Sequence, residues 1–374
     1  YNVPIDLIKK YNPQIKGNKI SKKMVLKIPF IKTIELEKSI EEIIEKTVDK
    51  SKKSTINLVD SVPKKKSIAF AFIAPFNLDN IEIDSIEKTK IYLEKLNLST
   101  LSLDFYSGTL VALQKAKNLG IKLQVDTYDN KNSFEEIDKI ANSKKIKNYD
   151  FILGPFIPRN INRLSSMLSE FNTPIVSPLT SKEINLNKNI FQSIPPVELQ
   201  RELMFRHVDS LILQDPDPCV MIIYDTSTEN VKEELLKRFP YAELIDTDLT
   251  MGLVDPEITD SLLVEQKNNL VFLESQNLNV ITSVSSLLNS QISKERNINM
   301  LSSYRSETYE NENISFQHLG NLKFTYPTYF YPKYDEELNE LNDLFFENFG
   351  KLPNKIVIRA YEITLDLILR SAFR

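Results

Sequence analysis

From residue 68 onward, short apolar runs alternate with longer stretches of helical period. The runs predict strands at residues 68–74, 122–128, 151–153, 174–176, 219–224, 270–273 and 298–301. The stretches between them predict helices at residues 103–118, 134–142, 160–171, 198–213, 229–238 and 277–289. Alternation at this spacing favours parallel sheets with right-handed crossover helices. There are too many units for one sheet of usual width, so we expect an α/β domain of two lobes.

The first 29 residues have a different pattern. Residues 5–11 suit a short helix that ends at Asn12-Pro13, because the residue before proline is disfavoured in a helix. Gly17-Asn18 predicts a turn, and residues 24–28 predict a strand that stops at Pro29. This part therefore reads as a small α+β module.

Residues 30–65 lack glycine and are rich in Lys, Glu and Ser. We interpret them as a charged linker with a transient amphipathic helix. The Lys-rich runs near residues 50–54 and 64–66 are expected to be solvated, and contact with an anionic surface is the alternative.

Composition narrows the class of protein. Apolar residues make up 41% and charged residues 26% of the 374 positions, with a formal net charge of -4, so nucleic acid is not an expected partner. No stretch has the roughly 18 apolar residues that cross a bilayer. The chain begins with Tyr1 rather than Met, so we expect a longer protein whose signal peptide or lipid anchor precedes this sequence.

The sequence offers little support for catalysis. Its seven glycines are too widely spaced for a phosphate-binding loop or a dinucleotide fingerprint. Cys219 lies in an apolar run and reads as a core thiol rather than a reactive one. His207 and His318 lie far from it and from any nucleophile motif, which argues against a metal site. We therefore expect a non-enzymatic protein without cofactor or metal.

An ordered set of motifs resembles the type I periplasmic binding proteins, whose best-known members bind Leu, Ile and Val. In chain order the motifs are Phe105-Tyr106-Ser107-Gly108 with Ala112, Asp126 to Asn130, Ile152-Leu153-Gly154-Pro155, Ile175-Val176-Ser177-Pro178, Phe191 to Pro196, and Tyr326-Pro327 onward. The resemblance implies a two-lobed fold with parallel sheets flanked by helices over residues 66–374. It places the first lobe at about 66–193 and 326–374, and the second at about 194–325 with its C-terminal part missing.

The resemblance also implies a ligand cleft at the carboxyl ends of the strands. The candidate ligand-binding residues are Phe156, Ile157, Ser177, Thr180, Ser181, Tyr224 and Asp225. The family commonly binds an amino acid there, although Phe156 and Ile157 make the first loop more apolar than a carboxylate cradle usually is. Two alternatives stay open. Ser181 or Asn160 could cap a helix instead, and the aromatic run at residues 324–332 could form a recognition surface rather than pack the crossover.

Residues 1–29 resemble the second half of a LysM module, through Tyr1-Asn2-Val3-Pro4, Tyr11-Asn12-Pro13 and the strand at 25–29. The resemblance implies binding of N-acetylglucosamine chains of peptidoglycan. The candidate glycan-binding residues of this half-groove are Asn12, Pro13, Gln14 and Ile15. The family's first strand and its Gly-Asp-Thr-Leu loop are absent from this sequence.

Together the two resemblances predict a periplasmic or cell-envelope protein that is tethered to peptidoglycan, with association with the outer membrane as a further option. Its two-lobed domain would close around a small ligand or bind a protein partner, without covalent chemistry. The alternative is a scaffold or regulatory subunit of an envelope complex that has lost small-ligand binding.

Overall fold

The computed structural model describes residues 67–373, except 83, 216, 248–252 and 331–335, and a few positions nearer the N-terminus: Lys9, Asn12, Ile15, Leu26, Leu58 and Val59. The side chains of 336–339 are not described. The chain divides into two compact units, Tyr1–Val62 and Pro63–Arg374. Apart from Leu26, the predicted LysM strand lies outside the described residues, as does almost all of the predicted linker. The helices and strands with described bounds all belong to the second unit.

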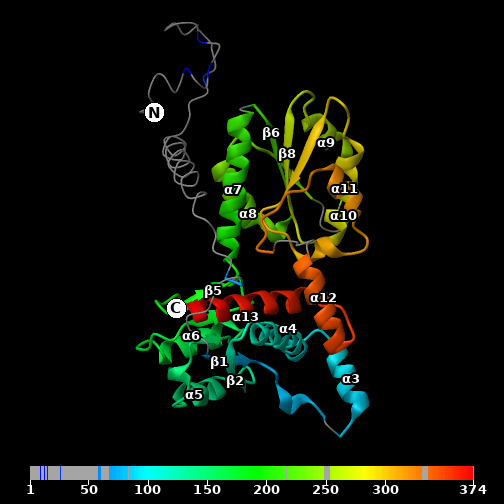
Figure 1. Ribbon diagram of the computed structural model, residues 1–374. Helices are drawn as coiled ribbons and strands as arrows, with labels where there is room; N and C mark the ends of the chain where they lie inside the picture. The colour runs from blue at the N-terminus through cyan, green and yellow to red at the C-terminus, as the bar shows by residue number, and fades with distance from the viewer. Residues whose placement is uncertain are drawn as a thin grey trace. The chain divides into compact units, whose positions relative to one another are not determined.

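One sheet of this unit has five parallel strands in the order β2-β1-β3-β4-β5. Figure 1 labels β1, β2 and β5 of this sheet. The strands are β1 (Ser67–Ala74), β2 (Lys122–Asp129), β3 (Phe151–Leu153), β4 (Ile175–Ser177) and β5 (Ile190–Gln192). β1 lies inside the sheet and is almost wholly buried, which explains why its sequence is a continuous apolar run.

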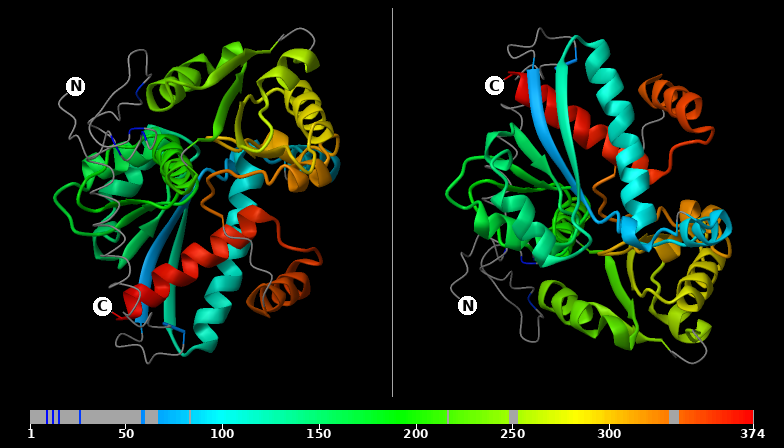
Figure 2. Two further views of the ribbon diagram at one scale, coloured as in Figure 1. Left: turned by 90° about the horizontal axis from the view of Figure 1, so that it is seen from above. Right: turned by 90° about the horizontal axis from the view of Figure 1, so that it is seen from below.

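Helices cover both faces of this sheet, and alternate residues of β1 face opposite layers. Ala71 and Ile73 pack with α5 (Phe134–Asn142) and α6 (Pro158–Met167). Phe72 points to the other face, where its ring lies 6.0 Å from that of Phe105 in α4 (Leu98–Asn118). This second layer also contains α13 (Lys355–Phe373), which runs beside α4 (Figure 2).

Gly108 allows α4 and α13 to approach closely. A Cβ at this position would lie 2.3 Å from the carbonyl oxygen of Val357 and 2.9 Å from the Cβ of Ala360. This contact gives a physical reason for the glycine in the Phe105-Tyr106-Ser107-Gly108 motif. The third helix of the layer, α12 (Glu336–Phe349), contributes Phe345 to an apolar cluster with Val111 and Val357.

The other sheet has four parallel strands in the order β7-β6-β8-β9. They are β6 (Cys219–Tyr224), β7 (Glu243–Asp246), β8 (Asn268–Glu274) and β9 (Asn297–Leu301). One face packs against α7 (Val197–Gln214) and α8 (Glu229–Arg238), and the other against α9 (Pro256–Leu262), α10 (Leu278–Ser290) and α11 (Phe316–Asn321). Each sheet is thus enclosed by helices on both sides.

The predicted α/β class, with two parallel sheets flanked by helices, is confirmed. Helix α4 begins at Leu98, five residues before the predicted start, because Asn97 and Thr100 form a capping box there. The elements that the sequence did not predict include the helices α3 (Ile86–Glu94), α9 and α11 and the strands β5 and β7. β7 lies at the edge of its sheet and is mostly exposed, so its sequence lacks the apolar run of a central strand.

None of the helices in the described residues is long and apolar enough to cross a membrane.

Candidate ligand site at the strand ends

The predicted ligand-binding residues follow the carboxyl ends of parallel strands in both sheets. Phe156 and Ile157 come after β3, and residues 177–181 begin at the end of β4, which pairs with β3. Tyr224 ends β6, with Asp225 directly after it. Since parallel strands end at one edge of a sheet, each set of loops lies at the edge where open α/β sheets bind ligands.

Phe156 belongs to the interior of the first lobe. Its side chain is buried, and its ring lies 5.0 Å from that of Phe105 and 6.1 Å, edge on, from that of Phe72. Gly154, two residues earlier, has φ of 100° and leaves no room for a Cβ beside the carbonyl oxygen of Ile73. The apolar loop noted in the sequence is therefore explained by core packing, and the role of Phe156 in ligand binding stays a prediction.

Helix α6 begins directly after this loop, with Ile157 as its N-cap and Pro158 at its start. No side chain caps the helix, and Asn160 lies within its first turn rather than at the cap. Ser181 caps no helix either, because the described residues 178–189 form an irregular loop that leads to β5. Helix capping by Ser181 or Asn160 was therefore wrong. The N-terminus of α6 offers few free amides, because Pro158 has no N–H and the Asn160 amide donates to the carbonyl of Ile157 at 3.0 Å.

The loop after β4 contains one hydroxyl of special interest. Ser177 is fully buried, and its Oγ has no hydrogen-bond partner among the described residues. Thr180 is also buried, but its Oγ1 accepts a hydrogen bond of 3.1 Å from the backbone of Lys182. Ser181 is partly exposed. The strand end thus holds a buried hydroxyl with unused hydrogen-bonding capacity.

Asp225 orders the turn after β6. Its buried carboxylate accepts hydrogen bonds from the backbone N of Ser227 at 2.9 Å and from the Oγ of Ser275 at 2.5 Å. Thr228 Oγ1 also donates to the carbonyl of Glu274 at 2.7 Å, which ties this turn to the end of β8. Asp225 therefore has internal partners for both carboxylate oxygens. Tyr224 is partly exposed, with the Lys232 ammonium 4.8 Å from its ring centre.

Glu274, the last residue of β8, was missed by the sequence analysis. It is buried and accepts two hydrogen bonds from Ser303, one from the backbone N at 2.7 Å and one from Oγ at 2.9 Å. Burial raises the pKa of the Glu274 carboxyl to about 7, although the hydrogen bonds from Ser303 and the charge of Arg201 oppose the shift. The sequence signal that could have identified Glu274 is a single carboxylate directly after the apolar run of residues 270–273.

Other polar groups are buried in the same lobe. Arg201 in α7 pairs with Glu234 at 2.6 Å, while its Nε has no partner in the described part of the chain. Ser306, five residues after β9, is buried, and no described residue bonds to its Oγ. The carboxyl edge of the second sheet therefore combines a carboxyl group of raised pKa with unsatisfied hydrogen-bonding atoms.

A polar cluster links α13 to two segments of the chain, one that precedes the second lobe in the sequence and one that follows it. Arg359 donates from Nη2 to the carbonyl of Ser193 at 2.8 Å, and its guanidinium lies 5.8 Å from the ring centre of Tyr329. Burial lowers the pKa of Arg359. On the same helix, Lys355 pairs with Glu310, which also pairs with Arg305 at 3.0 Å.

The remaining candidates for chemistry are separate from these strand ends. Cys219 is partly buried at the start of β6, where its Sγ donates to the carbonyl of Leu262 at 3.3 Å and burial raises the pKa of the thiol. His318 contacts Ser286 Oγ through Nδ1 at 3.3 Å. The described residues contain no group of three or more His, Cys, Asp or Glu side chains placed to hold a metal ion.

The glycan-binding residues fall in the first unit. Asn12 is buried, and its carbonyl accepts a hydrogen bond of 2.9 Å from the backbone of Ile15, while Pro13 and Gln14 lie outside the described residues. The half-groove therefore stays a prediction.

Comparison with known proteins gives similarity in structure alone. No protein-family model matches the sequence, and no curated protein matches it significantly. Among solved structures, a putative branched-chain amino acid ABC transporter protein from Rhodospirillum rubrum is 10% identical, with a TM-score of 0.51 over 82% of this chain and 88% of that one. An ABC-type branched-chain amino acid transporter protein from Rhodopseudomonas palustris is 11% identical, with a TM-score of 0.46 over 81% and 83%.

This chain has the type I periplasmic-binding-protein fold. The similarity to the Rhodospirillum rubrum protein covers both sheets, as the sequence motifs predicted. Because the sequence identity is so low, the comparison shows the fold alone. Any ligand or activity has to be argued from the residues of this chain.

Proposed function

We propose that this protein is a non-enzymatic binding protein of the cell envelope, whose two-lobed domain holds a small ligand with a cationic group at the strand ends. The observation that carries the proposal is Glu274. Its carboxyl is buried at the end of a central strand, and no described cationic side chain forms a hydrogen bond or ion pair with it. A buried carboxylate is costly without a countercharge, which a ligand ammonium group would supply.

An amino acid is the ligand class that fits best. Its ammonium group would pair with Glu274, and its carboxylate would accept hydrogen bonds from the loop after β4, with the positive dipole end of α6 as a further favourable charge. The Ser177 hydroxyl, buried without a described partner, would gain one through a local rearrangement of that loop. The Rhodospirillum rubrum protein with the same fold is described as a putative branched-chain amino acid transporter, which supports this class.

The test is a thermal-shift screen of the full chain against amino acids, their decarboxylated amines and their deaminated acids. A ligand at 100 times its Kd should stabilise the fold by about 2.7 kcal/mol, which is readily seen as a rise in Tm. Glu274→Gln should abolish the response, whereas Glu265→Gln, at an exposed position of the same lobe, should keep it. A full response in Glu274→Gln would exclude the proposed role of this carboxyl.

The LysM resemblance adds a tether to peptidoglycan, which would make the protein a stationary envelope component in the periplasm. Full-length protein should sediment with purified peptidoglycan, and soluble N-acetylglucosamine oligomers should compete with this binding. Failure to sediment would remove the tether and leave the ligand site untouched.

A scaffold of an envelope complex is the second candidate. Two predicted ligand-binding side chains favour it, because Asp225 is hydrogen-bonded within the turn and Phe156 packs in the aromatic core. Neither side chain is then available to contact a ligand. Absence of any thermal response, together with stoichiometric co-purification of one envelope protein, would support the scaffold over the receptor.

A further inference from the structure

A row of exposed lysines lies where the chain enters the strands of the first sheet. Parallel strands begin at one edge of a sheet, so the segments that lead into them lie side by side there. Since neighbouring strands are about 4.8 Å apart, the five strands spread this edge over about 19 Å. We refer to its six exposed lysines as the lysine edge: Lys117 in the last turn of α4, Lys122 at the start of β2, Lys144, Lys145 and Lys147 before β3, and Lys188 before β5.

Contacts between the segments hold the lysine edge together. The ammonium group of Lys145 lies 3.7 Å from the carboxylate of Asp126 in β2. The ammonium group of Lys147 lies 4.3 Å from the ring centre of Phe171, in the segment that leads into β4. Asn189, the residue before β5, donates a hydrogen bond of 3.4 Å to the carbonyl of Phe171. The segments that lead into β3, β4 and β5 therefore adjoin one another, with β2 beside them.

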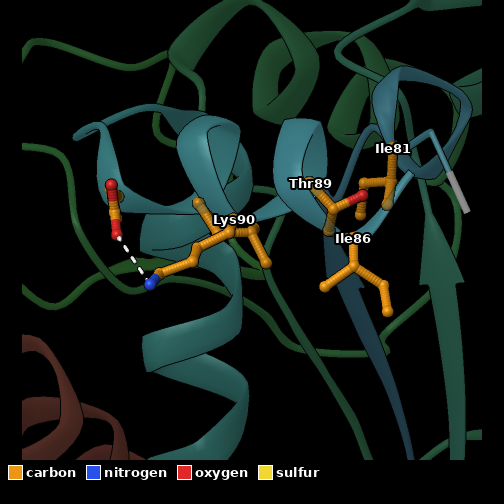
Figure 3. Close-up of a pocket in the computed structure, with 6 residues that line it drawn as sticks. Ile81, Ile86, Thr89 and Lys90 are labelled. Carbon is orange, nitrogen blue, oxygen red and sulfur yellow. Dashed lines mark ion pairs between the residues drawn. The ribbon is translucent and has the colours of Figure 1, made fainter.

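Most of the positive charge of the lysine edge is not neutralised within the described part of the chain. On other surfaces, many lysines pair with a nearby carboxylate, as Lys90 of α3 does with Glu94 at 3.9 Å (Figure 3). Four members of the lysine edge form no ion pair with any described residue, namely Lys117, Lys122, Lys144 and Lys188. Their ammonium groups can therefore meet negative charge from outside the chain.

The lysine edge is positive although the whole chain is negative. Its six lysines outnumber the carboxylates in the same strand and segments, which are those of Asp126, Asp150 and Glu170. The full sequence has a formal net charge of -4, so the rest of the molecule is acidic. A molecule with this charge distribution approaches an anionic surface with its positive edge in front.

The chemistry of this edge favours a broad anionic surface over a partner of defined shape. Its segments, residues 117–122, 144–150, 170–174 and 188–189, contain no arginine, whose planar fork recognises single phosphates or carboxylates. None of the exposed large apolar side chains of the described residues lies in these segments, so the apolar centre of a protein interface is missing. The same absence removes the aromatic platforms on which single-stranded nucleic acid stacks.

We propose that the lysine edge docks this protein onto the anionic phospholipid surface of an envelope membrane. A bilayer that contains acidic lipids presents negative charge over an area wider than the row, so all six ammonium groups can approach it together. Each lysine near such a surface strengthens binding about fivefold. The carboxyl ends of the strands, at the opposite edge of the sheet, stay open to a ligand in this orientation. The proposal does not depend on the ligand site.

Co-sedimentation of the full chain with lipid vesicles is the first test. The protein should bind vesicles of phosphatidylcholine mixed with phosphatidylglycerol, and it should stay in solution with phosphatidylcholine alone. Raising the ionic strength from about 0.1 M to about 1 M should release it, because the screening length falls from about 10 Å to about 3 Å. Combining Lys122→Gln, Lys144→Gln and Lys188→Gln should weaken binding about a hundredfold.

A matched control separates the position of the lysines from the net charge of the protein. The combination of Lys95→Gln, Lys237→Gln and Lys294→Gln removes the same charge at exposed positions that also form no ion pair with a described residue. This second triple variant should bind the anionic vesicles almost as the parent does. Circular dichroism of both triple variants should match the parent, since all six positions are exposed.

Acetylation with acetic anhydride gives a second measurement, on the unaltered protein. Anionic vesicles should protect the three substituted lysines of the lysine edge from the reagent. The three control lysines should stay reactive. Mass spectrometry of the digested protein would compare the two sets in one sample.

Several outcomes would overturn the proposal. One is the absence of binding to anionic vesicles, and another is equal binding by the two triple variants, which would assign the effect to the lysine runs near residues 50–54 and 64–66. Binding to nucleic acid or to a single envelope protein, without binding to vesicles, would replace lipid as the partner. Glu274→Gln should bind vesicles as the parent does, so the docking edge and the ligand site can fail separately.

Discussion

Arg359 of α13 donates a hydrogen bond of 2.8 Å to the carbonyl oxygen of Ser193, a residue 166 positions away in the chain. Ser193 directly follows β5 and precedes α7, so it belongs to the segment that leads from the first sheet to the second. The same guanidinium lies over Tyr329, in the segment that returns toward α13. One side chain of the last helix therefore contacts both connecting segments.

Replacing Arg359 with methionine should lower the free energy of unfolding by about 2 kcal/mol, because the hydrogen bond from a charged donor is lost while most of the apolar stem remains. Urea denaturation would measure the change. Arg370→Met on the same helix is the control, since Arg370 is exposed and pairs with Asp366 one turn away. Its effect should be below about 0.5 kcal/mol. Equal effects of the two variants would show that Arg359 adds nothing beyond a surface charge.

Gly108→Ala should destabilise the fold by about 1–3 kcal/mol, because the new methyl group would meet the carbonyl of Val357 at 2.3 Å and force α4 and α13 apart. Gly320→Ala is the matched control. Gly320 lies in α11, and an added Cβ there meets nothing within 4 Å. This second change should be neutral or slightly stabilising, since alanine favours helix. Thermal or urea denaturation of both variants would separate the steric effect from helix propensity.

Glu274 should make stability depend on pH. Its pKa is about 7 in the folded protein, above its ordinary value of 4.5, so the folded state retains a proton that the unfolded state loses. The protonated Glu274 carboxyl therefore contributes fully to the free energy of unfolding below about pH 4.5. This contribution, about 3 kcal/mol in total, is lost as the pH rises toward 7.

Glu274→Gln should flatten this part of the profile, because the amide can still bond to Ser303 but has no proton to lose. Unfolding free energies at pH 5 and pH 8 should converge in the variant relative to the parent, with Glu265→Gln as the control. An unchanged difference between the two pH values in Glu274→Gln would show that the titrating group lies elsewhere.

Two buried serines should respond in opposite ways to alanine. The hydroxyl of Ser177 has no described partner, so Ser177→Ala should leave the free energy of unfolding unchanged or raise it by up to about 2 kcal/mol. Ser165 Oγ accepts a hydrogen bond of 2.8 Å from Asn187, so Ser165→Ala should cost about 1 kcal/mol. Calorimetry of both variants would decide. A clear loss of stability in Ser177→Ala would mean that its hydroxyl has a partner in solution, such as an ordered water.

Most of the strands that the sequence predicted are almost wholly buried, because full burial produces a continuous apolar run such as that of β1. The exception is the edge strand β2, which was predicted although none of its residues is buried. Helices α5 and α8 were predicted with their observed bounds, and a polar N-cap residue, Ser133 or Thr228, precedes each of them. β7 escaped prediction because an edge strand needs few apolar residues. α3 was missed for a related reason: none of its residues is buried, so it sets no apolar stripe against a core.

The sequence predicted which loops form the candidate site, but only partly how their side chains are arranged. Motifs such as Gly154-Pro155 and Ser177-Pro178 mark strand ends, so position along the chain was enough to locate the loops. The sequence could not show that Phe156 turns into the aromatic core, or that Asp225 bonds to Ser275 fifty residues away. Glu274 was overlooked because burial, which raises its pKa, depends on long-range packing.

The position of α13 against α4 and β1 has a consequence for synthesis of the protein. The second sheet is built entirely from residues 219–301, a continuous stretch, and can form its strand pairs as soon as that stretch leaves the ribosome. The five strands of the first sheet emerge sooner, yet one of their faces is covered only in part, by α4, until residues 355–373 arrive. The part of the domain made first is therefore completed last, and during that interval its exposed apolar face is the natural target for a chaperone.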